Sequence, residues 1–231
     1  MLNIQYKLRF EDDSERLFEL CLDEQTLQLI PADATEHPAW TALDNHRCPN
    51  CPLDAKTHPH CPAACAITDI VSASDDLFSY TQVKVDVQTP ERLVTADTTL
   101  QRAVSSLLGL ALATSGCPHT AFFKPMARFH LPFASEEETI YRATSMYLLA
   151  QYFRRKQGGD ADMDLSGLTE IYRNLQVVNM HMARRLRAAS DKDATVNAVV
   201  ILDMFAKALP YTIDESLQEI RYLFSSYLDG E

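Results

Sequence analysis

The stretch NIQYKLRF, at residues 3–10, decides the fold class of the N-terminal part of this chain. Its polar and apolar side chains alternate, with Ile4, Tyr6 and Leu8 on one side. Because successive side chains of a strand point to opposite faces, this period of two predicts a β-strand with one buried face. Further short strands are expected at 16–22, 26–30, 80–87 and 92–96. Together they predict an antiparallel meander of about five strands.

From residue 98 onward the apolar residues recur at steps of three and four, which is the period of a helix with one buried face. Ser135 and Glu138 have the spacing of a capping box, and Thr98, Asp191 and Thr212 are further expected N-caps. Helices are expected at 98–115, 135–157, 166–188, 191–209 and 212–227. The sequence therefore predicts an α+β fold, in which an N-terminal antiparallel β-meander with an inserted Cys-rich segment precedes a C-terminal bundle of about five helices.

The two parts of the chain differ in charge. Residues 1–97 hold 7 Lys and Arg against 17 Asp and Glu, whereas residues 98–231 hold 14 against 15. We expect an acidic β part at 1–97, with its Cys-rich insertion at 36–76, and a helical part at 98–231, packed closely as one unit. The net charge of −11 argues against nucleic acid as a partner, because affinity for DNA depends on Lys and Arg at phosphates.

The apolar stretches are short, and the one at 107–113 falls far below the roughly 20 residues that a membrane helix requires. The first residues also lack the pattern of a secretory signal. We therefore expect a cytoplasmic protein that does not contact a membrane. Thiols stay reduced in that compartment, so clustered cysteines are expected to bind metal or to react rather than to form disulfides.

Four of the six cysteines fall within 18 residues, at Cys48, Cys51, Cys61 and Cys65. Zn²⁺ takes four sulfur or nitrogen ligands, and a two-residue gap allows both thiolates of one turn to reach the same ion. Pro62 is suited to the first position of a short helix, which would place Cys61 and Cys65 on one face. We predict that these four cysteines bind a metal, with zinc favoured and an iron–sulfur cluster as the alternative.

Three histidines, His46, His58 and His60, lie in the same segment and are alternative ligands. Cys-Pro dipeptides occur at Cys48, Cys51, Cys61 and Cys117. Regulatory haem can be bound through such dipeptides, and the geometry of a loop also accounts for the prolines.

A second candidate site lies in the Phe- and Pro-rich connection that follows the first predicted helix. Its candidate residues are Cys117, His119, Lys124, Arg128 and His130. They could form a pocket for an anionic ligand, or Cys117 and His119 could bind metal or activate a thiol. The alternative is that the two cations pair with acidic residues where the two parts meet, and that the histidines are ordinary hydrogen-bonding groups. Three further arginines, Arg184, Arg185 and Arg187, are expected on a solvated helix face.

Two functions follow from these candidates. The first is a cytoplasmic regulatory or protein-interaction module, stabilised by metal and without catalytic activity, whose partner is another protein or a second copy. No Walker A loop, dinucleotide fingerprint or Gly-x-Ser-x-Gly motif is found in the sequence. The second is an enzyme or a small-molecule or redox sensor, with an iron–sulfur cluster as one version, centred on residues 117–130. A single pocket containing the five candidate side chains would favour the second function, and their separation would favour the first.

Overall fold

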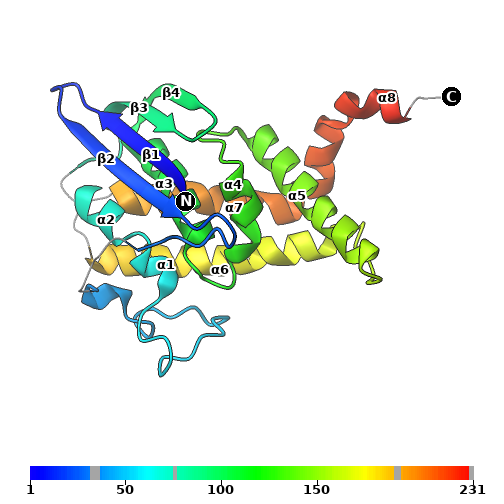
Figure 1. Ribbon diagram of the computed structural model, residues 1–231, viewed down its shortest axis with the longest axis horizontal. Coiled ribbons are helices and arrows are strands. Elements are labelled where there is room, and N and C mark those ends of the chain that lie inside the picture. Colours follow the sequence, from blue (N-terminus) through cyan, green and yellow to red (C-terminus); the bar gives the residue numbers. More distant parts are fainter. Residues whose placement is uncertain (32–36, 75–76, 190–193, 229–231) are drawn as a thin grey trace.

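The structure is a computed structural model that describes residues 1–31, 37–74, 77–189 and 194–228 (Figure 1). It has an α+β fold, in which a four-stranded antiparallel sheet is followed by helices. The strands are β1 (Leu2–Arg9), β2 (Glu15–Leu22), β3 (Gln82–Gln88) and β4 (Leu93–Thr99). Their order in the sheet is β2-β1-β3-β4, and each neighbouring pair is antiparallel.

The alternation at the start of the chain places one face of the sheet in the core. Leu2, Ile4, Tyr6 and Leu8 of β1 are all buried. The strand expected at 26–30 is wrong, because this segment forms only one bridge, between Leu22 and Leu29. The backbone N–H of Leu29 donates instead to a carbonyl at the end of a helix, so the segment is diverted from the sheet.

The longest helices are α3 (Leu100–Thr114), α5 (Glu136–Lys156), α6 (Ser166–Ala189) and α7 (Ala194–Glu219). Short helices are α1 (Pro62–Cys65), α2 (Thr68–Ser74), α4 (Lys124–Arg128) and α8 (Ser225–Leu228), with 3₁₀ turns η1 (Ala39–Thr41), η2 (Ala121–Phe123) and η3 (Arg221–Phe224). Helix α7 packs against α3, α5 and α6, and α3 contacts β3 and β4. The helices therefore cover the buried face of the sheet.

Some helix ends match the sequence and others do not. The capping box of Ser135 and Glu138 is present, with both reciprocal hydrogen bonds. Thr98 lies in β4, and the N-cap of α3 is Thr99, which makes no capping hydrogen bond through its side chain. The helices expected at 191–209 and 212–227 are instead α7, η3 and α8, and residue 212 lies inside α7. Residue 191 lies outside the described residues.

Position 210, between the two expected helices, is a proline. A proline inside a helix removes one backbone hydrogen bond and often bends the helix, but it does not have to end it. Helix α7 continues through this position.

One apolar core joins the sheet to the helices. It includes residues of β1, β2 and β3, of α3, α6 and α7, and also Ala63, Ala64 and Ile67 of the Cys-rich insertion. The insertion therefore shares the core of the molecule. Within the described ranges, none of the helices is long and apolar enough to cross a membrane.

Candidate metal centre

A small cavity of about 20 Å³ lies where the Cys-rich segment meets α6 and the loop after α3. Four of the residues that line it are cysteines: Cys48, Cys51, Cys61 and Cys117. The first two belong to one tight turn, the third is the N-cap of α1, and the fourth follows α3. Three separate segments of the chain therefore bring four thiols to the wall of one cavity.

The four cysteines share a local feature, because each is followed by proline. Proline disfavours a helical backbone at the residue before it, and Cys61 is extended, with φ −73° and ψ 116°. The chain then turns sharply: the carbonyls of Cys48, Cys61 and Cys117 each accept an N–H from a residue three or four positions later. A cysteine whose carbonyl closes a turn thus recurs at three points around the cavity.

Cys65 is the predicted ligand that does not line this cavity. It is the last residue of α1 and is half-buried. Burial raises the pKa of its thiol, and a hydrogen bond with Thr41 acts in the opposite direction. Cys117 lines the cavity in its place, although it is separated from the cluster in sequence by β3, β4 and α3.

The three alternative ligands also lie elsewhere. His58 is exposed, and its Nδ1 is 2.9 Å from the hydroxyl of Thr57. The Nδ1 of His60 is 2.9 Å from the hydroxyl of Thr41. His46 and both of these side chains are absent from the cavity wall.

His119 lines the cavity, but one of its ring nitrogens is already used. Its Nε2–H donates to the backbone carbonyl of Asn50 at 2.7 Å. This hydrogen bond ties the loop after α3 to the turn between Cys48 and Cys51. The contact therefore supports a role for His119 in positioning the two loops.

One face of α6 holds the Cys-rich segment. Asn174 accepts a hydrogen bond from Asn50 (2.8 Å), and His181 donates to the carbonyl of His46 (3.0 Å). Val178 and Met182, on the same face, line the cavity. The segment is therefore fixed to α6 by polar contacts. Between these contacts, apolar side chains of α6 form part of the cavity wall.

Arg185 lies on this same face, and its side chain is only 2% exposed. The solvated position expected for Arg184, Arg185 and Arg187 is therefore wrong for Arg185, whereas the other two are exposed. Its guanidinium lines the cavity and donates to three backbone carbonyls at 2.6–2.9 Å, those of Trp40, Ala42 and Leu43.

In the part of the chain that the structure describes, Arg185 forms no salt bridge with a carboxylate. A buried cation is costly unless an anion compensates its charge. The groups on this cavity wall that can become anionic are the cysteine thiols, which carry a negative charge when they are deprotonated.

Without a metal, burial favours the neutral form of two of these thiols, those of Cys48 and Cys117. Burial raises the pKa of the Cys48 thiol to about 12, and the neighbouring Cys61 and Cys117 raise it as well, while Arg185 lowers it. Burial also raises the pKa of Cys117. A bound metal cation reverses this balance, because it deprotonates a coordinating thiol outright. Among the described residues, no three His, Cys, Asp or Glu side chains are already grouped as ligands of one ion.

The five candidates at 117–130 do not share one pocket. Cys117 and His119 line the cavity described above. The ammonium of Lys124 donates to the carbonyl of Thr26 at 2.7 Å. Arg128 and His130 line a different cavity of about 100 Å³ beside β1.

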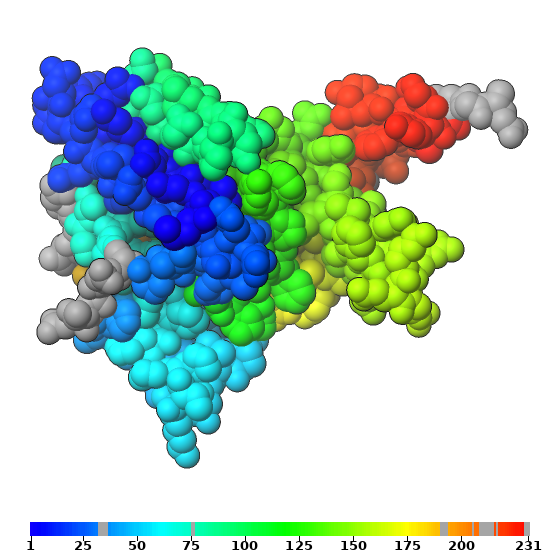
Figure 2. Space-filling view, in the orientation of Figure 1, coloured from blue at the N-terminus to red at the C-terminus, as the bar shows by residue number. Residues whose placement is uncertain are grey.

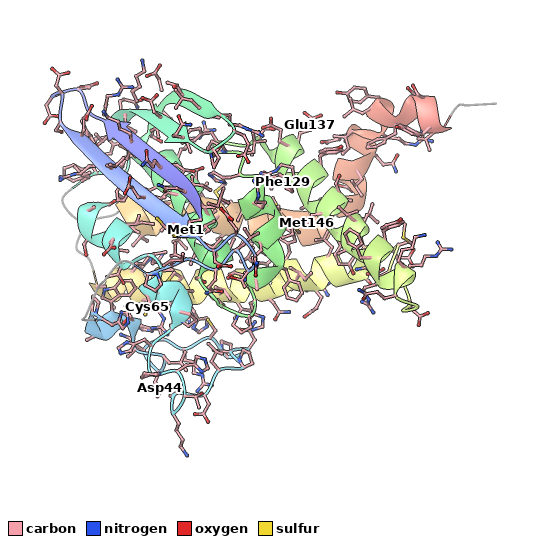
Figure 3. All side chains as sticks on the ribbon, in the orientation of Figure 1. Met1, Asp44, Cys65, Phe129, Glu137 and Met146 are labelled. Carbon is pink, nitrogen blue, oxygen red and sulfur yellow. The ribbon has the colours of Figure 1, made fainter. Side chains whose placement is uncertain are left out.

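In this second cavity Arg128 forms an ion pair with Glu91 at 3.0 Å. The Nε2 of His130 forms a hydrogen bond with the hydroxyl of the buried Tyr6. Phe129, from the same loop, lies well apart from Cys65 in Figure 3. The loop therefore contributes separately to two places in the molecule.

Comparison with known proteins identifies a family for this chain. No curated protein and no solved structure matches it. A family model described as a domain of unknown function, DUF6901, matches residues 4–225, a range that contains the sheet, the long helices and the four cavity cysteines. This chain is a member of the DUF6901 family.

Proposed function

We propose that this protein is a metal-stabilised regulatory or protein-interaction module without catalytic activity. One zinc ion, held by Cys48, Cys51, Cys61 and Cys117, fixes the Cys-rich segment to α6 and presents that segment to a partner protein. The observation that carries the proposal is the convergence of four thiols from three segments on one cavity, beside a buried arginine that lacks a carboxylate partner within the described residues.

The charges of such a site are complementary to Arg185. Four thiolates around one divalent cation carry a net negative charge, which is costly to bury alone. The guanidinium of Arg185 lies on the cavity wall and would offset part of that charge. Its three carbonyl contacts hold it in place, so its position does not depend on the metal.

The size of the cavity favours a single ion. A space of about 20 Å³ is close to the roughly 10–15 Å³ that one water-sized sphere occupies. An iron–sulfur cluster of several iron and sulfide atoms needs considerably more room. Zinc with four cysteine ligands also has no open coordination position, which fits a structural site and not a catalytic one.

A bound metal would stabilise the Cys-rich segment, which has little apolar core of its own. Residues 44–60 contain no helix or strand, and most of their side chains are exposed or half-buried. This segment forms the downward projection in Figure 2. Such a segment has little apolar surface to bury, whereas structural zinc supplies about 10–16 kcal/mol of apparent binding free energy. Closing the site requires the four sulfurs to move closer to one another, which local turns permit more easily than a packed core.

The decisive experiment compares two single substitutions, Cys117→Ser and Cys65→Ser. Metal content is measured by elemental analysis on protein purified under reducing conditions, together with an absorption spectrum. We expect about one zinc per chain in the wild type and in Cys65→Ser, and a loss of zinc in Cys117→Ser. Cys65 is the matched control because it is a neighbouring, half-buried cysteine.

Each other outcome has a definite meaning. Zinc retained in Cys117→Ser but lost in Cys65→Ser would overturn the ligand set that the cavity suggests. Iron with visible absorbance would replace zinc by an iron–sulfur cluster and would favour a redox sensor. Wild-type protein that contains no metal and binds no added zinc would overturn the proposal.

A further inference from the structure

The C-terminal residues form an arm that the body of the molecule does not cover. All residues from 221 to 228, in η3 and α8, are exposed. The arm nevertheless carries five large apolar side chains: Tyr222, Leu223, Phe224, Tyr227 and Leu228. Tyr227 is 86% exposed, and Figure 2 shows the arm projecting away from the sheet. A short helical segment without tertiary packing is marginal in water, so the arm requires a surface to pack on.

Helix α5 has an apolar stripe on its outer side as well. Its inner side buries Ile140, Ala143 and Tyr147 against the core. Tyr141, Leu149, Tyr152 and Phe153 are all exposed, and their spacing places them along the opposite face. A helix that is apolar on both faces is expected to be buried on both. The rings of Tyr141 and Phe224 lie 6.5 Å apart, so the stripe on α5 continues into the arm.

The charges at the two ends of α5 are opposite. Three glutamates occupy the first turn, Glu136, Glu137 and Glu138, and three cations occupy the last, Arg154, Arg155 and Lys156. All six residues are exposed, and within the described residues none of them forms a salt bridge. Figure 3 shows Glu137 at the upper end of the helix, the end nearer the sheet. The surface of α5 is therefore acidic, apolar and basic in sequence along its length.

We propose that this face binds a second copy of the chain, in a two-fold symmetric dimer whose α5 helices pack antiparallel. In that arrangement the acidic end of each helix faces the basic end of the other, and the apolar stripes meet at the centre. A two-fold interface joins the same patch on both copies, so the patch must be complementary to itself. The order of charges along α5 meets this requirement. The arm of each copy then packs against its mate.

The apolar area is sufficient for such an interface. Large aromatic side chains bury about 150–250 Å² each when fully covered. The nine exposed apolar residues of α5 and the arm are mostly half exposed or more, so together they offer on the order of 800 Å² per copy, the size of a standard interface. The dimer does not depend on the proposed zinc site, because the Cys-rich segment and the arm lie on opposite sides of α6 in Figure 1.

The first test is the mass of the full-length protein in solution, measured by light scattering or sedimentation at micromolar concentration. The expected mass is twice the chain mass of 26.0 kDa. The substitution pair Leu149→Glu and Phe153→Glu places charges in the centre of the interface and should convert the protein to a monomer, with circular dichroism confirming that it is folded. A wild-type monomer, or a variant that stays dimeric, would overturn the proposal.

The second test uses the charges to identify the arrangement. Glu136→Lys with Glu137→Lys makes both ends of α5 basic, which should weaken the dimer by about tenfold or more. Adding Arg154→Glu and Arg155→Glu restores the opposite charges in reversed order and should restore the dimer. Glu11→Lys with Asp69→Lys is the matched control, with the same charge change at exposed sites away from α5. If the variant with all four substitutions forms an even weaker dimer, the antiparallel arrangement is wrong. The same holds if the control weakens the dimer equally.

Discussion

The sheet and the Cys-rich segment of this protein are stabilised in different ways. The sheet buries alternate apolar side chains of β1, β2 and β3 in the core together with α3. Residues 44–60 have no regular structure and are fixed to α6 by two hydrogen bonds, one from Asn50 to Asn174 and one from His181 to the carbonyl of His46. Arg185 holds the residues just before this segment, through the carbonyls of residues 40, 42 and 43. The sheet is therefore held by buried apolar area, whereas the segment is held by a few polar contacts and, on our proposal, by a metal.

Each region also buries polar groups, and their charge states differ. Below the sheet, the hydroxyl of Tyr6 lies between Ser106 and His130, and all three groups are neutral near pH 7. Beside α6, the buried polar group is the permanently charged Arg185. Hydrogen bonds alone satisfy a neutral network, but a buried cation also requires a compensating charge. The difference is that the second region buries a charge, and on our proposal the thiolates of the metal site compensate it.

Removal of the metal should have the largest effect and should separate the two regions. A strong zinc chelator is expected to release residues 44–60 from α6, because about 10–16 kcal/mol of apparent binding free energy is lost there. Amides of this segment should then lose protection from hydrogen exchange, while those of β1 and β3 keep it. Equal loss of protection in both regions would show that the segment and the sheet unfold as one unit.

Substitution of Arg185 should have the next largest effect. Arg185→Met keeps the length of the side chain but removes three hydrogen bonds to backbone carbonyls, so we expect the free energy of unfolding to fall by about 3–5 kcal/mol. The carbonyl of Leu43 is buried and loses its side-chain donor, whereas that of Ala42 keeps the N–H of Asn45. Zinc affinity should fall as well, because the positive charge beside the thiolates is gone. Arg184→Met, on the exposed neighbouring position, is the control and should change neither quantity. Unchanged zinc affinity in Arg185→Met would contradict the role of this charge.

Much of the fold could be predicted from sequence patterns. The features that could not be predicted depend on contacts between distant parts of the chain. Periods of two and of three to four residues predicted the strands of the sheet, helices α3, α5 and α6 and the capping box at Ser135, because these features depend on neighbours along the chain. The strand expected at 26–30 is wrong because the backbone N–H of Leu29 donates to the carbonyl of Thr114, at the end of α3. The local pattern does not contain this distant partner.

The cavity shows the same limit more sharply. Cys65 satisfied the local spacing rule for a ligand pair, whereas Cys117 reaches the cavity only through the fold. Proline after Cys117 was the signal that could have found it, since the same dipeptide occurs at the other three cavity cysteines. Arg185 gave no such signal, because a cation near a helix C-terminus is favourable at the surface too.

A substitution in the apolar core should act on the other region. Leu108→Ala removes a fully buried side chain of α3, and we expect a loss of about 2–5 kcal/mol in the free energy of unfolding. Zinc content should remain unchanged, because Leu108 does not line the cavity. Urea denaturation gives the first quantity and elemental analysis the second. A parallel fall in zinc content would mean that the metal site depends on the packing of α3 and would weaken the distinction between the regions.

The neutral network below the sheet predicts the smallest effect, which depends on pH. Burial lowers the pKa of His130 to about 4, and the positive charge of Arg142 contributes, whereas an unfolded histidine has a pKa of about 6.5. Between these values the unfolded chain binds the proton more strongly, so stability should fall as the pH is lowered from 6.5 towards 4. Near pH 5 the contribution is on the order of 1 kcal/mol, allowing for partial contact of the ring with solvent.

The variant His130→Gln isolates this contribution, because glutamine can still form a hydrogen bond with Tyr6 but does not take up a proton. Acid also releases zinc from thiolates, and that effect is common to both proteins. The difference between the two proteins in urea midpoint, followed from pH 7 to pH 4.5, therefore reports on His130 alone. The wild type should lose stability faster than His130→Gln over this range. Parallel curves would mean that His130 is protonated in the folded protein, and the buried network below the sheet would then carry a charge, as the region beside α6 does.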